Sequence, residues 1–200
     1  MQSRVNNEKI MNSLIVEAIL SKSESTGLDV ELIERAYRFA EESVGKCLRD
    51  SDGTSVIGHY IRVVAILTLE LNLVDSDAIA AGFLHSLVSY TDITYQMLED
   101  KFGKQISNLV RLFKASPDDD EEQKVVIQRL QESPEGLASL IKLADRLDNI
   151  RRLRFANQPE KRARYIQQTE NLYVPFAKKM NPYIYDAMLS ALQRLKAQHE

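Results

Sequence analysis

The segment LASLIKLADRL, residues 137–147, indicates the fold class of this chain. Its leucine, isoleucine and alanine residues recur at spacings of three and four, the period of a helix with one buried face. The same period recurs along nearly the whole chain, and no stretch alternates apolar and polar residues as a half-buried strand would. We therefore predict an all-α protein.

Length and composition favour one domain. The chain has 200 residues, of which 44% are hydrophobic, and a domain of this size buries about 70% of its unfolded surface. Aspartate, serine and proline residues supply helix start signals. We expect a single compact bundle of about ten helices, near residues 8–21, 29–45, 59–73, 76–90, 94–102, 104–115, 121–132, 135–154, 159–179 and 182–198.

Charge and cysteine content exclude several classes of protein. Cys47 is the only cysteine, so the chain has no internal disulfide or thiolate zinc site and fits a reducing compartment. The formal net charge of −3 argues against nucleic acid as a partner. The N-terminus has neither a signal-peptide core nor an apolar run of about 20 residues. We expect a soluble, cytoplasmic protein with no membrane partner.

The N-terminal segment carries its own apolar stripe at helical spacing. We predict an amphipathic helix over residues 8–21 that covers an apolar surface of the domain or of a second subunit. The residues of the stripe are Ile10, Met11, Leu14, Ile15, Ala18 and Ile19.

Three polar residues stand in apolar surroundings. His59 follows a glycine-containing loop, His85 shares a helical face with small apolar residues, and Asp145 lies four residues after Ile141. A carboxylate on such a face is costly to bury unless a cation, a metal or a hydrogen-bond donor meets it. Taken singly, each residue fits a hydrogen-bonded place in the core better than a functional role.

Five segments resemble one known family in order and approximate spacing: IGHYIRVVAIL (57–67), GFLHSLVSYT (82–91), TYQMLEDKFGKQISNLV (94–110), SLIKLADRLDNIRRL (139–153) and TENLYVPFAKKM (169–180). They are similar to the hydrolase domain of the RelA/SpoT homologues, metal-dependent HD-fold enzymes that remove the 3′-pyrophosphate of ppGpp. The resemblance spans residues 28–185. It implies an HD domain over residues 27–200, preceded by a helical extension, residues 1–26. Because no synthetase domain follows, the chain resembles the small stand-alone hydrolases.

The resemblance implies a metal site that is incomplete. His59, His85 and Asp145 match three of the four family ligands to one divalent metal, typically manganese. Ser86 stands where the family has the fourth ligand, an aspartate. The implied site is therefore weak or absent, or is replaced by a buried polar network.

The catalytic acids of the family are also replaced. Ser89 and Tyr90 stand at the two positions, so no catalytic residue is intact. On one continuous helix, His85, Ser86, Ser89 and Tyr90 would face one pocket. Neutral hydroxyls provide neither a hard anionic ligand nor a base near neutral pH.

The nucleotide-binding residues that the resemblance implies are partly retained. Arg49, Lys142, Arg146 and Asn149 match family positions, whereas the loop of residues 49–53 carries acids where basic residues are expected. Asp148 replaces the usual histidine. For Arg146, a structural ion pair is the alternative interpretation.

Three functional hypotheses follow. The first is a degenerate homologue of the ppGpp hydrolases, catalytically weak or inactive, that binds a guanosine nucleotide such as ppGpp or a protein partner. The second is an active metal-dependent phosphohydrolase with a reduced ligand set, whose acids come from residues 118–122 or Asp92. The third is a structural helical domain that forms homo-oligomers.

Overall fold

The computed structural model describes residues 2–45, 47–49, 53–113, 119–132, 136–153 and 159–197, with the side chains from residue 7 onward. All regular elements in these ranges are helices, and one isolated bridge joins Leu48 to Ser55. The predicted all-α class is confirmed. The chain forms two compact units, Met1–Leu48 with Thr54–Arg111, and Arg49–Gly53 with Leu112–Glu200. Each unit is described by itself.

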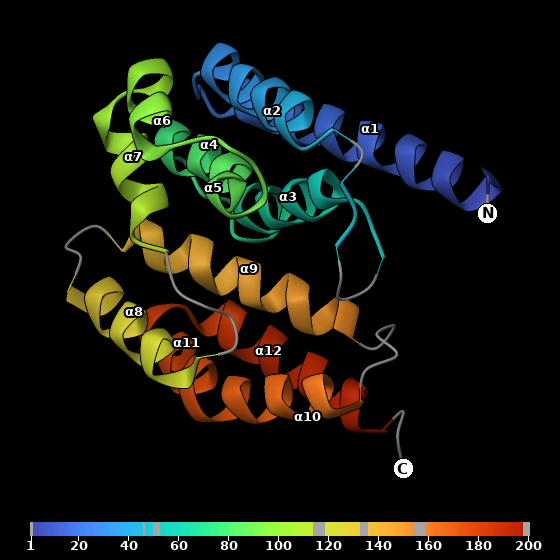
Figure 1. Cartoon of the computed structure of the whole chain (residues 1–200), viewed down its shortest axis with the longest axis vertical. Coiled ribbons are helices and arrows are strands. Elements are labelled where there is room, and N and C mark those ends of the chain that lie inside the picture. The colour runs from blue at the N-terminus through green and yellow to red at the C-terminus, as the bar shows by residue number, and fades with distance from the viewer. Residues whose placement is uncertain are drawn as a thin grey trace. The chain divides into compact units, whose positions relative to one another are not determined.

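The first unit is built around α4, whose side chains from Ala78 to Leu84 are all buried. Helices α2, α3 and α7 pack against α4, and α1 packs against α2 and α3 (Figure 1). The helices of this unit are α1 (Gln2–Ser25), α2 (Val30–Val44), α3 (Val56–Ala65), the π-helix η1 (Ile66–Glu70), α4 (Ser76–Leu84), α5 (Leu87–Tyr90), α6 (Tyr95–Phe102) and α7 (Lys104–Arg111).

Helix α1 confirms the predicted N-terminal helix but not the face that it buries. Val16, Ile19 and Ser23 face the unit, whereas Ile10 and Leu14 are 61% and 55% exposed. Spacings of three and four from Val16 to Ser23 define the buried face, and the exposed apolar residues lie on the opposite face. The stripe chosen from the sequence mixed these two faces because both carry apolar residues.

Two predicted helix limits in the first unit are wrong. Helix α3 begins at Val56 and not at His59, so Gly58 is helical. The helix expected over residues 76–90 breaks at His85 and Ser86, which form a turn between α4 and α5. Ser86 has φ −122° and ψ 8°, outside the α-helical range. Apolar periodicity continues across this turn and therefore does not reveal it.

The second unit is built around α9, which contacts every other helix of that unit (Figure 1). Most of its side chains are buried, including three charged ones, Lys142, Arg146 and Asp148. The helices are α8 (Asp120–Glu132), α9 (Leu137–Leu153), α10 (Pro159–Gln168), the π-helix η2 (Thr169–Tyr173), α11 (Val174–Met180) and α12 (Pro182–Ala197).

The long helix predicted over residues 159–179 is continuous but contains a π-turn. The backbone N–H of Val174 bonds to the carbonyl of Thr169, five residues earlier. Pro175 follows directly and has no N–H to donate, which favours a change in the hydrogen-bond pattern at this point. In the described part of the chain, none of the helices combines the length and the apolar composition of a membrane span.

Candidate metal and nucleotide site

In the first unit, His59 and His85 lie against each other. Their ring centres are 5.3 Å apart with an interplanar angle of 70°, and Tyr60 packs beside both rings. Both histidines are buried. His59 comes from the first turn of α3, and His85 is the C-cap residue that follows α4. Within the first unit, the structure therefore brings two of the predicted metal ligands together.

A backbone hydrogen bond orients the His85 ring. Its Nδ1 lies 2.8 Å from the carbonyl oxygen of Gly82. A carbonyl only accepts, so Nδ1 carries the proton and the lone pair of the neutral ring is on Nε2. Metal-binding histidines usually have this arrangement, with one nitrogen on a backbone carbonyl and the other on the metal. His85 thus has the protonation pattern of a ligand.

The three positions at which the family resemblance implies acids do not share one helical face with His85. Ser86 is half-buried in the turn, whereas Ser89 and Tyr90 are exposed on the four-residue helix α5. The prediction that all four side chains lie on adjacent strips of a single helix is wrong, because α4 ends at Leu84.

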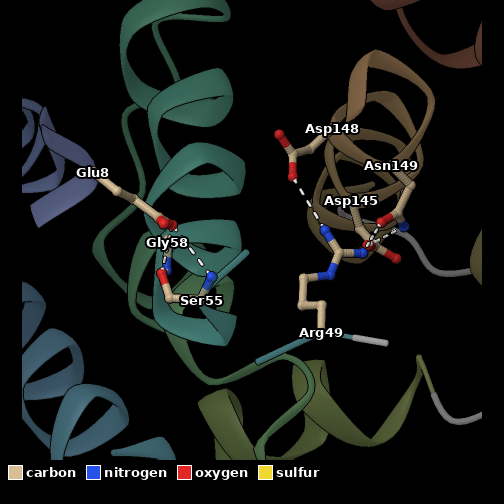
Figure 2. A network of polar contacts seen from close by, with 7 residues as sticks. All are labelled: Glu8, Arg49, Ser55, Gly58, Asp145, Asp148 and Asn149. Carbon is tan, nitrogen blue, oxygen red and sulfur yellow. Dashed lines mark hydrogen bonds and ion pairs between the residues drawn. The ribbon is translucent and has the colours of Figure 1, made fainter. Parts of the chain in front are cut away.

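In the second unit, the Asp145 carboxylate is held by its own helix. Asn149 Nδ2 donates to Asp145 Oδ1 at 2.8 Å (Figure 2). Lys142 Nζ lies 3.8 Å from Asp145 Oδ2. These residues lie three and four apart on α9, so their side chains share one face. The carboxylate is half-buried, and the two α9 side chains limit its orientation.

Arg49 joins this cluster from the loop before α3. Its Nη2 donates to Asn149 Oδ1, and its Nη1 lies 3.8 Å from Asp148 Oδ2 (Figure 2). Arg49 and Asp148 are both buried. Three of the four predicted nucleotide contacts, Arg49, Lys142 and Asn149, therefore lie together. The acids of the neighbouring loop, Asp50 and Asp52, fall outside the described residues.

Arg146 occupies a different environment from the other predicted nucleotide contacts. Its guanidinium lies over the rings of Tyr165 and Tyr173, and its Nη2 donates to Gln168 Oε1. Gln168 in turn donates to Asp120 Oδ1 at 2.6 Å. Burial raises the pKa of the Tyr165 phenol, against the lowering effect of the Arg146 charge. The sequence did not predict the roles of Tyr165 and Tyr173, because no spacing within α10 or η2 indicates that both contact Arg146.

The acidic run before α8 serves as a helix start. Asp119 Oδ1 accepts hydrogen bonds from the backbone N–H groups of Glu121 and Glu122. Asp119 thus caps the helix locally, whereas Asp120 accepts the long-range hydrogen bond from Gln168. Asp118 lies outside the described residues.

A family model described as HD domain matches residues 36–181. This chain belongs to the HD-domain family. It is 34% identical over 136 residues to MESH1 of Drosophila melanogaster, a guanosine-3′,5′-bis(diphosphate) 3′-pyrophosphohydrolase, covering 66% of this chain and 72% of that protein. A solved structure of a metazoan orthologue of SpoT, described as hydrolysing ppGpp, superposes with a TM-score of 0.72 at 25% identity. That superposition covers 82% of this chain and 94% of the other.

Larger relatives of this HD-domain chain contain additional sequence. The guanosine-3′,5′-bis(diphosphate) 3′-pyrophosphohydrolase of Aquifex aeolicus is 33% identical over 156 residues, which cover 75% of this chain but 22% of that protein. The chain thus spans about a fifth of the length of such relatives. The resemblance to RelA/SpoT homologues that the sequence motifs indicated is confirmed.

Proposed function

We propose that this HD-domain chain is a degenerate relative of the ppGpp hydrolases that binds a guanosine nucleotide such as ppGpp and hydrolyses it weakly or not at all. The observation that carries the proposal is the pairing of a retained basic cluster with lost acids. Arg49 donates to Asn149 and Lys142 lies beside Asp145, while Ser86, Ser89 and Tyr90 occupy the family's acid positions.

Three residues would hold a divalent metal in this proposal. His59 and His85 would supply imidazole nitrogens, and Asp145 a carboxylate oxygen. The His85 ring supports this assignment, since its Nδ1 is bonded to Gly82 and its Nε2 has the lone pair. A bound divalent metal lowers the pKa of a water ligand and neutralises phosphate charge. With one carboxylate instead of two, we expect weaker affinity than in intact relatives.

The loss of acids would affect chemistry more than binding. A positioned acid or base contributes about 10²–10⁴-fold to the rate, and the hydroxyls of Ser89 and Tyr90 do not replace it near neutral pH. Phosphate binding depends instead on positive charge, which Arg49 and Lys142 retain. The proposed outcome is a domain that recognises a phosphorylated nucleotide and releases it unchanged.

Thermal denaturation with ppGpp, GDP and pyrophosphate tests binding. A ligand at 100 times its Kd adds about 2.7 kcal/mol of stability, so ppGpp should raise the melting temperature clearly. Arg49→Ala and Lys142→Ala should each reduce this increase. Arg38→Ala is the control, because Arg38 is exposed and paired with Glu34 on α2. Equal increases in the wild type and both site variants would contradict the proposal.

An active hydrolase with a reduced ligand set is the second candidate, and the two adjacent histidines favour it. Release of pyrophosphate from ppGpp with added manganese separates the two candidates. We expect turnover at least about 1,000-fold below that of a homologue with the complete motif. Rapid manganese-stimulated turnover that His85→Ala abolishes would favour the active enzyme instead.

A further inference from the structure

The first turn of α3 contains His59 and is held from outside the helix. Ser55 is the N-cap, and its Oγ accepts a hydrogen bond from the Gly58 N–H at 3.1 Å. The N–H of His59 bonds to the Ser55 carbonyl at 3.3 Å. Helix ends leave backbone groups unsatisfied and open most readily, so the orientation of His59 depends on this cap.

Glu8 of α1 completes the cap. Its Oε1 accepts hydrogen bonds from the Ser55 hydroxyl at 2.7 Å and from the Ser55 N–H at 3.2 Å (Figure 2). The bond from the hydroxyl directs the Ser55 proton toward Glu8 and leaves a lone pair of Oγ for Gly58. A carboxylate at a helix N-terminus also interacts favourably with the helix dipole.

Gly58 leaves the space that these oxygens occupy. A Cβ atom at residue 58 would lie 2.7 Å from Ser55 Oγ and 2.9 Å from Glu8 Oε1. Both distances are below van der Waals contact, so any larger residue at position 58 would displace one or both side chains. The three residues therefore form one hydrogen-bonded cluster, which we call the α3 cap: Glu8, Ser55 and Gly58.

We propose that Glu8 is a positioning residue that holds the first turn of α3 and thereby orients the His59 imidazole for metal binding. This inference rests on the proposed function, since it assigns His59 as a ligand. It gives the N-terminal helix a role in the site, although Glu8 lies before the region that the family model matches, residues 36–181. Metal ligands must be held closely in place by surrounding groups, and the α3 cap is such a group.

The test compares Glu8→Ala and Glu8→Gln with Glu17→Ala in the full chain. Glu17 lies on the same helix, is exposed, and gives the same change of charge. We expect Glu8→Ala to speed amide exchange at Gly58 and His59 roughly fivefold, as loss of an N-cap interaction does. Manganese affinity, measured by titration, should fall about tenfold. Glu17→Ala should leave both values unchanged.

Two further variants separate positioning from a general loss of stability. Glu8→Gln keeps an oxygen acceptor and should restore most of the exchange protection. Gly58→Ala should reproduce the effects of Glu8→Ala and add little to them in a double variant, because both disrupt the same cap. The NMR signals of the His59 ring should shift in Glu8→Ala while those of His85 stay in place.

Unchanged exchange at Gly58 and an unchanged His59 ring signal in Glu8→Ala would overturn the inference. Equal effects of Glu17→Ala on exchange and on manganese affinity would overturn it as well. Failure of the wild type to bind manganese would instead contradict the metal assignment in the proposed function. In that case, the exchange rates and ring signals still decide whether Glu8 orients His59.

Discussion

The guanidinium carbon of Arg146 lies 3.9 Å from the centre of the Tyr173 ring, and both side chains are buried. Tyr165 lies at 4.7 Å from the same guanidinium. A desolvated cation over two aromatic rings is stabilised by about 2 kcal/mol or more. This arrangement supports a structural role for Arg146 in joining α9 to α10 and η2, beside the nucleotide contact that the family resemblance implies.

Replacing Arg146 with alanine should therefore lower stability. We expect the free energy of unfolding to fall by about 2–4 kcal/mol, since a buried hydrogen-bonded charge and its stacking contacts are lost. Arg129→Ala on the exposed face of α8 is the control and should change it little. Urea denaturation measures both. If Arg146→Ala is as stable as Arg129→Ala but binds ppGpp more weakly, the structural role is wrong and the nucleotide contact is favoured.

Asp77 makes stability depend on pH. Partial burial and the neighbouring carboxylates of Asp75 and Asp29 raise the pKa of Asp77. Because the pKa of Asp77 is raised in the folded state, folding favours the protonated carboxyl. The stability that protonated Asp77 allows is present at low pH and is lost as pH rises through the folded pKa. Asp77→Asn should therefore be modestly more stable than the wild type near pH 7, and the difference should shrink as pH falls toward the ordinary carboxyl pKa.

Urea midpoints at neutral and acidic pH check the Asp77 prediction. Asp92→Asn is the matched control, because Asp92 is exposed in the same unit. If the gain in stability from Asp77→Asn increases as pH falls, the prediction is wrong.

Restoring a carboxylate at residue 86 should strengthen metal binding. Ser86→Asp adds an anionic ligand next to His85, and divalent-cation affinity rises with the charge of the ligand set. We expect manganese affinity to increase roughly tenfold. Ser86→Asn, of nearly equal size but neutral, should give a much smaller increase, and Asp145→Ala in the Ser86→Asp protein should remove the gain. An unchanged affinity in a folded Ser86→Asp protein would argue against the metal assignment.

Activity should need more than this fourth ligand. Ser89→Glu and Tyr90→Asp would return the two acids, and we expect ppGpp hydrolysis only when all three changes are combined. Ser89 and Tyr90 are exposed on α5. The activity of the triple variant therefore also depends on where α5 places the two new acids. Pyrophosphate release measures the outcome, and activity of Ser86→Asp alone would show that the acids are unnecessary.

Gly82 permits close packing within the first unit. A Cβ at this position would lie 3.0 Å from Val64 Cγ2 and 3.1 Å from Leu67 Cδ1. Gly82→Ala should lower the free energy of unfolding by about 1–3 kcal/mol, the usual cost of overpacking a core. It should also disturb the His85 ring, because the Gly82 carbonyl accepts the His85 hydrogen bond. An unchanged urea midpoint would mean that α3 and η1 move aside without cost.

Local patterns were sufficient for the helical class, and the family resemblance selected Lys142 and Asn149 beside Asp145. Lys142, Asp145 and Asn149 lie three and four residues apart on α9, so the helical period alone places them on one face. The same reasoning failed for His85 and Ser86, because a turn interrupts the helix without interrupting the apolar period. It also failed for α1, where apolar residues lie on both faces.

The sequence by itself determined that the chain is helical and which of its motifs resemble the ppGpp hydrolases, because helix period and motif spacing are properties of neighbouring residues. Only the tertiary structure decided which long-range partners those residues have. Glu8 meets Ser55 across 47 positions and Arg49 meets Asn149 across 100. Such contacts depend on how helices pack, and packing joins surfaces that no local spacing relates.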